Sequence, residues 1–258
     1  MVFGSIANNE TENLKLKIET NMNFRAIIFL VFCAFTITLN AQSEYLIESE
    51  NDLFWQPNVK INFSHYQAET DSACLKYYER YGLQMASSVG IRGVVDIPQA
   101  HLSRNIRRRR GVDKSYLAPV FCKNCSCKLS EDSLILKVDQ LLFDVAEICA
   151  RGARKELFEM QGEMKTNNVN TMFFTTVKNS WDEKMQSFFG PILREILIEK
   201  KEGAYAEWRQ TVDELLQQTE NFATQPQDCY RFVLGKPIER NYVQAEQIMG
   251  DLRNRNER

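Results

Sequence analysis

Three closely spaced cysteines are the residues in this sequence best placed to do chemistry. Cys122, Cys125 and Cys127 form a C-x-x-C-x-C run, and Cys74 could add a fourth sulfur. Such a set can hold a structural zinc ion, or its members can pair as disulfides. We favour disulfides, because the chain has no second C-x-x-C pair and is expected to be exported. A redox role stays open, although the strand–helix context of thioredoxins is missing.

Two histidines are the remaining candidates for metal binding. His65 lies in a strand-like run, and His101 lies 36 positions later beside an arginine-rich segment. We expect both to be ordinary surface or hydrogen-bonded side chains. The alternatives are a metal site that the two share with a carboxylate, or a pairing of one histidine with a cysteine thiol. Nothing in the sequence places these groups together.

The arginine-rich segment after His101 is a candidate binding loop. Five of seven consecutive positions are arginine, and such a cluster could bind an anionic glycan or a lipid head group. More often a run of like charges keeps a loop exposed and solvated. We therefore expect an exposed hairpin loop and keep its arginines as weak candidates: Arg104, Arg107, Arg108, Arg109 and Arg110.

The composition and the N-terminus bound the class of protein. A net charge of -2 over 258 residues predicts no general attraction to nucleic acid. Arg25 precedes an apolar run of 14 residues, 26–39, and Ala41 is a small residue at the expected cleavage point. The run is short for a membrane span of about 20 residues. We predict an upstream extension and signal peptide over residues 1–41, starting at Met1 or Met22, and a periplasmic or secreted protein. Contact with the membrane would come only through that segment if it stays uncleaved.

The element that must position most of these groups is a long helix predicted over Ser130–Met160. Apolar residues recur at steps of three and four along it and form one broad stripe. Ser130 is the expected N-cap. Glu131 and Asp132 would place negative charge at the N-terminal end of the helix, where the helix dipole is positive. Taken alone, this pattern indicates a core helix. The stripe consists of Leu134, Ile135, Val138, Leu141, Leu142, Val145, Ile148 and Cys149.

The same helix resembles the signature of a bacterial family of exported, predicted zinc-dependent proteases, a domain of unknown function. The family signature reads approximately L-x-x-H-E-Q-x-H-F-D-I-A-E, followed by an alanine–arginine stretch. Phe54-Trp55, Ile61-Asn62-Phe63 and the segment from Tyr205 to Trp208 are similar to other parts of that family. The residues that match the central run are Gln140, Phe143, Asp144, Ala146, Glu147, Ala150, Arg151 and Arg154.

The resemblance also shows what this chain lacks. An HExxH helix uses two histidines to hold zinc and a glutamate as general base on metal-bound water. The matching stretch here is Val138-Asp139-Gln140-Leu141-Leu142, so neither histidine position has a metal-binding atom. The family's third ligand would fall on Ile198. We therefore expect aliphatic side chains to fill the site as core, with no cofactor and no catalytic residue.

The order of elements predicts an α+β fold: an N-terminal antiparallel sheet packed on long C-terminal helices, zincin-like without the metal site. Further stripes predict helices over residues 173–196, kinked at Gly190-Pro191, and over 205–222, ended by Pro226. Pro119 suggests an edge position for the strand Tyr116–Cys122. The expected domains are the leader 1–41, a degenerate zinc-protease-like domain over 42–225, and a tail over 226–258.

Two functions remain. The first is a non-catalytic relative of the zinc-protease family that serves as a binding or structural module for an unknown protein or envelope component. The second is a zinc-dependent hydrolase with relocated ligands, such as His65, His101 and a carboxylate. We favour the first, because HExxH chemistry needs donor atoms at both helix positions. The binding surface would be the cleft beside the central helix or the arginine loop.

Overall fold

The computed structural model describes residues 47–70, 72–103, 105 and 110–246. The chain divides into two compact units, residues 1–44 and 45–258. The first unit, with the predicted signal peptide, lies outside the described residues, and so do residues 247–258. None of the described helices is long and apolar enough to cross a membrane.

The second unit has an α+β fold, as predicted. Its main sheet is antiparallel with the strand order β1-β4-β3-β6, and β2 and β5 form a separate antiparallel pair. The long β3–β4 hairpin runs from the pair Val89 and Phe121 to the pair Asp96 and Lys114. The strands are β1 (Asp52–Phe54), β2 (Met85–Ala86), β3 (Val89–Pro98), β4 (Lys114–Cys122), β5 (Cys127–Lys128) and β6 (Tyr242–Gln244).

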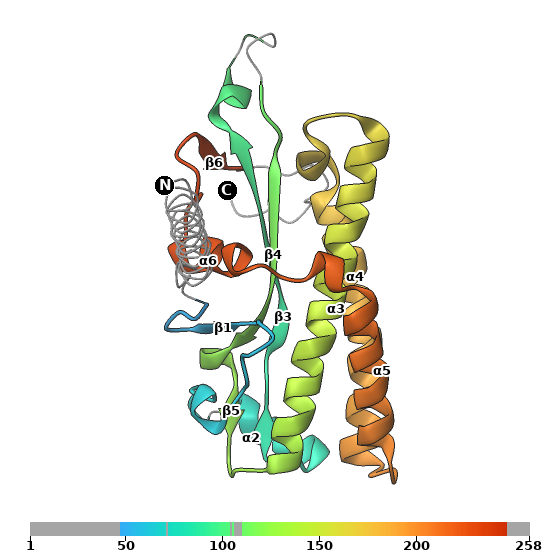
Figure 1. Cartoon of the computed structure of the whole chain (residues 1–258). Coiled ribbons are helices and arrows are strands. Elements are labelled where there is room, and N and C mark those ends of the chain that lie inside the picture. Colours follow the sequence, from blue (N-terminus) through green and yellow to red (C-terminus); the bar gives the residue numbers. More distant parts are fainter. Residues whose placement is uncertain (1–46, 71, 104, 106–109, 247–258) are drawn as a thin grey trace, which may run out of the picture. The chain divides into compact units, whose positions relative to one another are not determined.

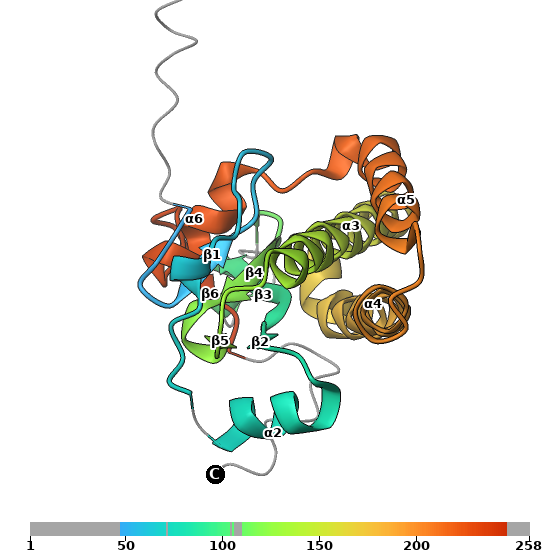
Figure 2. The same ribbon diagram turned by 90° about the horizontal axis from the view of Figure 1, so that it is seen from below.

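Helices cover both faces of this sheet. In Figures 1 and 2, α3, α4 and α5 lie on one side of β3 and β4, and α6 lies on the other. Short 3-10 turns occupy 63–65, 99–102, 123–125 and 220–222, and a π-helical segment, η5, follows α4 at Arg194–Ile198. The α-helices are α2 (Ser72–Tyr81), α3 (Ser133–Met164), α4 (Val169–Leu193), α5 (Ala204–Gln218) and α6 (Pro226–Leu234).

Alternation along β4 explains the two layers. Successive side chains of a strand point to opposite faces, and both faces of β4 are apolar. Leu117 and Phe121 belong to the large core under α3 and α4, whereas Ala118 and Val120 belong to a smaller cluster with Cys229 of α6. The sheet is therefore buried on both sides along this strand.

The central helix begins later than predicted. Asp132, and not Ser130, is the N-cap, since its carboxylate accepts hydrogen bonds from the backbone N–H groups of Leu134 and Ile135 at 2.8 and 3.2 Å. Asp and Ser are about equally good caps, so tertiary contacts decide between them. Ser130 instead lies near Gln84, to which its hydroxyl donates. The predicted stripe is buried except at Leu134, which is 40% exposed.

The edge position suggested by Pro119 is wrong. β4 lies between β1 and β3. The carbonyl oxygen of Pro119 accepts the backbone N–H of Trp55, so the ring nitrogen faces the same side, just past the end of the short strand β1. The missing N–H therefore costs no hydrogen bond to β3.

The segments between β1 and α2 and after α5 also pack on the sheet and helices. Val59 closes a turn with Gln56, and the N–H of Ile61 donates to the side chain of Gln140. Pro226 begins α6, where its fixed φ suits the first turn, and residues 226–244 contribute α6 and β6 to the fold. The buried ion pair between Arg231 and Asp96 fastens α6 to β3 at 2.6 Å. Residues 226–244 therefore contact the main sheet through both elements.

Candidate binding site beside the central helix

The positions that correspond to the metal-binding motif lie in the buried middle of α3. Val138 is fully buried in the core, and Leu142 is 4% exposed. Both side chains are aliphatic and pack in the large apolar cluster of the sheet and helices. The two positions that the resemblance matches to histidines are therefore part of the apolar core.

Asp139, at the position of the family's glutamate, is a buried carboxylate with two hydroxyl partners. Ser87 donates to one oxygen at 2.6 Å, and the phenol of Tyr66 donates to the other. Burial raises the pKa of Asp139 to about 6, against the lowering effect of the two hydrogen bonds. Burial and the nearby Asp139 also raise the pKa of Tyr66 above its ordinary range, so the phenol stays protonated and donates.

A cavity of about 240 Å³ opens beside this carboxylate. Among the described residues that line it, Asp139 is the only charged one, and the other polar groups are two serines, a tyrosine and a glutamine. The remaining wall is apolar, and half of its residues come from α3 and the end of α4. The lining residues are Tyr77, Leu83, Met85, Ser87, Ser88, Val89, Ile135, Asp139, Leu142, Gln186, Phe189, Leu193 and Leu197.

This donor set does not fit a zinc ion. Zinc in a catalytic site takes three protein ligands drawn from imidazole, thiolate and carboxylate groups. The described residues that line the cavity offer one carboxylate and no histidine, cysteine or second acidic side chain. Across the described part of the chain, no group of three or more His, Cys, Asp and Glu side chains is arranged to hold a metal ion.

Ile198, matched to the third ligand, does not lie with the other two positions. It is 52% exposed at the end of η5 and does not line the cavity, whereas its neighbour Leu197 is buried and does. The match assumed no gap between the two sequences, so a shift of one residue would place Leu197 at the ligand position. An aliphatic side chain stands at either residue.

Residues shared with the family signature hold α3 to its surroundings. Asp144 is buried and accepts the indole N–H of Trp55 at 2.8 Å and a guanidinium N–H of Arg209 from α5 at 2.6 Å. Gln140 also donates to Asp144 and accepts the backbone N–H of Ile61. This network joins three segments that are far apart in the sequence.

A second network surrounds Glu147, which is fully buried. Arg151 donates to its carboxylate at 2.7 Å, and Arg154 lies 3.4 Å from its other oxygen. The backbone N–H of Thr224 donates at 2.8 Å, and the hydroxyl of Thr224 also donates. A buried carboxylate needs such partners, because an unpaired charge in the interior is costly. These shared residues therefore have structural roles that need no metal.

A wider groove of about 720 Å³ lies along the face of α3 that carries Asp144 and Arg151. Its acidic and basic residues are mixed, and some pair with one another: Arg209 contacts both Asp144 and Asp213. The cavity at Asp139 differs, since its single charge has no basic partner among the lining residues. It is therefore the better candidate for a specific binding site.

The two histidines lie far from each other. The ring of His65 is 6.5 Å from that of Phe121, which pairs with Val89 at the start of β3, and His101 follows the end of β3. Ten residues of strand span roughly 30 Å. His65 bonds within its own turn to Asn62, and His101 to the carbonyl of Gly111. One metal ion cannot bind both in this structure.

The cysteine run forms disulfides, as favoured from the sequence. Cys74 is bonded to Cys127, and Cys122 to Cys125, so these sulfurs are not available as the suggested zinc ligands. Cys149 and Cys229 are free and buried, and burial raises the pKa of each thiol to about 12. Disulfides are compatible with an oxidising compartment.

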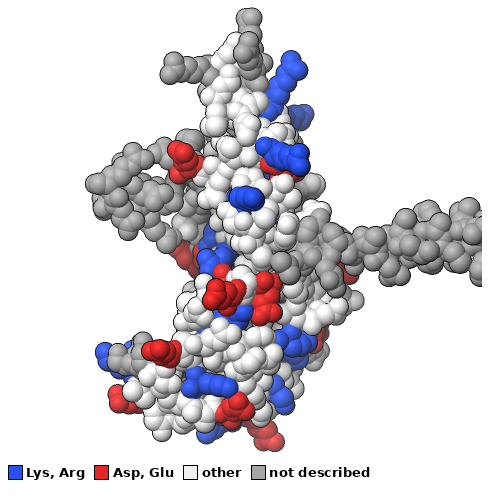
Figure 3. All heavy atoms as spheres, turned by 90° about the vertical axis from the view of Figure 1, so that its left-hand side faces the viewer, with Lys and Arg blue, Asp and Glu red and all other residues white. Residues whose placement is uncertain are grey.

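Most of the arginine cluster cannot be placed. Arg104, Arg107, Arg108 and Arg109 lie outside the described residues, and Arg110 is exposed. On the face shown in Figure 3, where α6 and β1 lie, basic and acidic side chains are interspersed among the described residues. The arginine loop remains a predicted site without further support.

No protein-family model, curated protein or solved structure matches this chain. The resemblance to the predicted zinc proteases therefore depends on the motif residues themselves. Tyr66 and Ser87, the two partners of Asp139, were not among the residues singled out from the sequence. Only their contact with α3 in the fold identifies them, because both are common residue types in unremarkable surroundings.

Proposed function

We propose that this chain is a non-catalytic relative of the exported, predicted zinc proteases and acts as a binding module outside the cytoplasm. The observation that carries the proposal is which side chains occupy the motif positions in α3 and how they are buried. Buried aliphatic groups stand where two histidines would hold the metal, and Asp139 is held by Tyr66 and Ser87 beside a cavity. The scaffold contacts of Asp144 and Glu147 do not depend on a metal.

The chemistry of the cavity favours a ligand with a primary ammonium group on an apolar stem. Asp139 supplies the only charge of the lining, and a carboxylate with two hydroxyl partners still has lone pairs to offer. Leu83, Val89 and Leu197 would surround the stem. An apolar cavity of about 150 Å³ holds benzene, so a cavity of about 240 Å³ holds a four-carbon amine. A lysine side chain of a partner protein and a free alkylamine share this chemistry.

Binding of n-butylammonium to the purified mature chain, followed by NMR, tests the proposal. We expect saturable binding at pH 7 that weakens about tenfold or more in Asp139→Asn, because a charge-assisted hydrogen bond contributes roughly 1.5–3 kcal/mol. The neutral isostere n-butanol should bind both proteins alike. A lysine-containing peptide distinguishes a protein partner from a free amine as the natural source.

Two outcomes would contradict this function. Equal binding of n-butylammonium to the wild type and to Asp139→Asn would remove the carboxylate from the site. Hydrolysis of a peptide substrate that stops when zinc is chelated would favour the alternative, a zinc-dependent hydrolase with relocated ligands.

A further inference from the structure

The two disulfides of this protein differ in their surroundings. Cys74–Cys127 joins α2 to β5 across a sequence separation of 53, and both cysteines are almost completely buried. Cys122–Cys125 spans a separation of three at the end of β4, where Cys125 is exposed and Cys122 is half-buried. Of the two pairs, only the second therefore includes an exposed cysteine.

The short disulfide is also the weaker constraint on the unfolded chain. In the chain-entropy model, the stabilisation from a cross-link grows with the logarithm of the length of the loop that it closes. The loop between Cys122 and Cys125 is very short, whereas the loop between Cys74 and Cys127 includes α2, β2, β3 and β4. A purely structural role thus explains Cys74–Cys127 better than it explains Cys122–Cys125.

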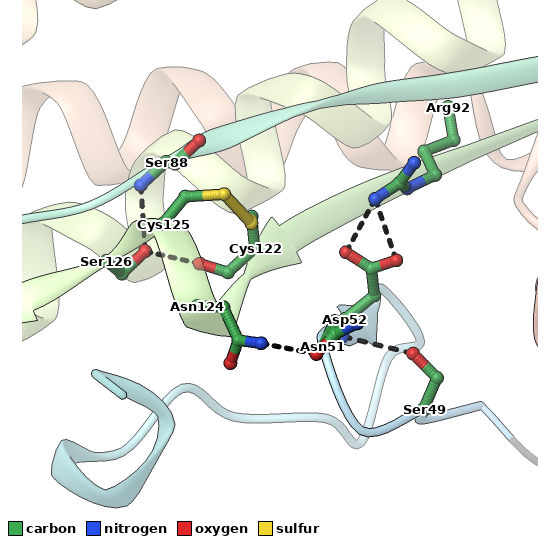
Figure 4. The surroundings of a disulfide bond; sticks show 9 residues. All are labelled: Ser49, Asn51, Asp52, Ser88, Arg92, Cys122, Asn124, Cys125 and Ser126. Atoms are coloured by element: carbon green, nitrogen blue, oxygen red, sulfur yellow. Dashed lines mark hydrogen bonds and ion pairs between the residues drawn. A yellow bond between two sulfur atoms is a disulfide. The ribbon is translucent and has the colours of Figure 1, made fainter. Parts of the chain in front are cut away.

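Backbone hydrogen bonds hold the turn at Cys122–Cys125 without the sulfur–sulfur bond. The N–H of Lys123 donates to the carbonyl of Asn51 at 2.7 Å, and the N–H of Cys122 donates to the carbonyl of Ser88 at 2.9 Å. Figure 4 shows the hydroxyl of Ser126 between two segments of the protein. It donates to the carbonyl of Cys122 at 2.7 Å and accepts the N–H of Ser88 at 2.9 Å.

These contacts keep the turn in place when the disulfide opens. The side chain of Lys123 is buried and pairs with Glu48 at 2.8 Å, and Asn124 donates to Asn51 (Figure 4). Reduction would leave both thiols on a fixed turn, within reach of each other for reoxidation. A pair that opens and closes without unfolding the protein is what reversible exchange needs.

We propose that Cys122–Cys125 is a thiol–disulfide exchange site that acts on dithiols. A thiolate of the dithiol attacks the sulfur of Cys125, the bond between Cys125 and Cys122 breaks, and Cys122 leaves as the thiolate. The second thiolate of the dithiol then attacks the mixed disulfide and releases Cys125. The dithiol loses two electrons and two protons and becomes a disulfide, and the cysteine pair gains them. Oxidised glutathione, by the reverse exchange, restores the pair.

The other cysteines do not compete for this chemistry. Cys149 and Cys229 are completely buried, and burial keeps their thiols protonated at neutral pH. Cys74 and Cys127 are covered in the folded protein. Among the four disulfide-bonded cysteines, attack from solution is therefore directed to Cys125, the one exposed residue.

The test uses the oxidised, folded mature chain in buffers with graded ratios of reduced to oxidised glutathione. Free thiols are then alkylated, and the labelled peptides are identified by mass spectrometry. We expect labels on Cys122 and Cys125 at ratios that leave Cys74 and Cys127 unlabelled and the circular dichroism spectrum unchanged. Oxidation of dithiothreitol by the native protein should be lost in the double variant Cys122→Ser/Cys125→Ser.

Thermal unfolding supplies the comparison with the other disulfide. The variant Cys122→Ser/Cys125→Ser should lower the unfolding midpoint less than Cys74→Ser/Cys127→Ser, or should fold where the latter does not. Labelling of all four cysteines together, only under conditions that unfold the protein, would overturn the proposal. Undiminished oxidation of dithiothreitol by Cys122→Ser/Cys125→Ser would also overturn it. Neither result depends on whether the cavity at Asp139 binds an amine.

Discussion

The phenol of Tyr66 donates a hydrogen bond to the carboxylate of Asp139, 73 positions later in the chain. This contact occupies one oxygen of the buried carboxylate, and the hydroxyl of Ser87 occupies the other. It holds Asp139 in a buried position in which the ionised form is costly. The pH dependence of stability should therefore differ between the wild type and a variant that lacks this carboxylate.

Asp139 should make the protein less stable as the pH rises. Its pKa is about 6 in the folded protein and 3.8 in an unperturbed chain. Because the folded pKa is higher, Asp139 makes its full contribution to the free energy of unfolding below about pH 4, and this contribution is lost as the pH rises through about 6. At 1.36 kcal/mol for each unit of pKa difference, the loss is about 3 kcal/mol.

Denaturant unfolding of the wild type and of Asp139→Asn at several pH values measures this effect. We expect the wild type to lose about 3 kcal/mol relative to the variant between pH 4 and 7. Glu183→Gln, which changes an exposed carboxylate of α4, is the matched control and should follow the wild type. Parallel stability curves for the wild type and Asp139→Asn would show that Asp139 does not titrate in this range.

Asp144 should be more important for stability than Asp213, although both contact Arg209. Asp144→Ala leaves the indole N–H of Trp55 and part of the Arg209 guanidinium without an acceptor in a buried place, which should cost about 3 kcal/mol of unfolding free energy. Asp213, with a side chain that is 62% exposed, forms a surface pair, so Asp213→Ala should cost less than about 1 kcal/mol. Equal losses in urea titrations would argue against a structural role for the signature residue.

Gly152 should tolerate no side chain, because α3 and α4 touch there. A Cβ at this position would overlap the ring of Trp181, which is held by a hydrogen bond to Glu156 at 2.8 Å and by Lys184 over its face. Gly152→Ala should therefore destabilise the protein by about 1–3 kcal/mol, despite the better helix propensity of alanine.

Gly162 lies in the same helix with nothing close to its missing Cβ. Gly162→Ala should stabilise the protein by up to about 1 kcal/mol, since only helix propensity changes. Calorimetric unfolding of both variants compares the two positions directly. A stabilising Gly152→Ala would show that the two helices pack less closely than described.

Periodicity predicted the elements that are long and strongly patterned. The stripe on α3, the division into sheet and helices, and the β3–β4 hairpin follow from the sequence, because burial of an apolar face depends on spacing alone. Periodicity does not predict local details such as the helix N-cap or the place of a proline in the sheet. Ser130 and Asp132 are similar caps, and Pro119 fits a central strand only because β1 ends beside it.

The site itself was predictable only in part. The absence of ligand atoms at Val138 and Leu142 is visible in the sequence, but the environment of Asp139 is not. Tyr66 and Ser87 reach it from separate segments, as Arg231 reaches Asp96 from a stretch that looked like a tail. The disulfide partners were likewise open, since the six cysteines that follow the predicted signal peptide allow many pairings. Such long-range contacts depend on the assembled fold.

Zinc binding by the purified mature chain is the most direct test of the central claim that α3 no longer supports metal catalysis. Equilibrium dialysis against zinc, followed by metal analysis and a peptide hydrolysis assay, gives the answer. We predict far less than one zinc ion per chain and no hydrolysis that responds to a chelator. A content of about one zinc ion per chain, lost on chelation together with hydrolytic activity, would contradict the account.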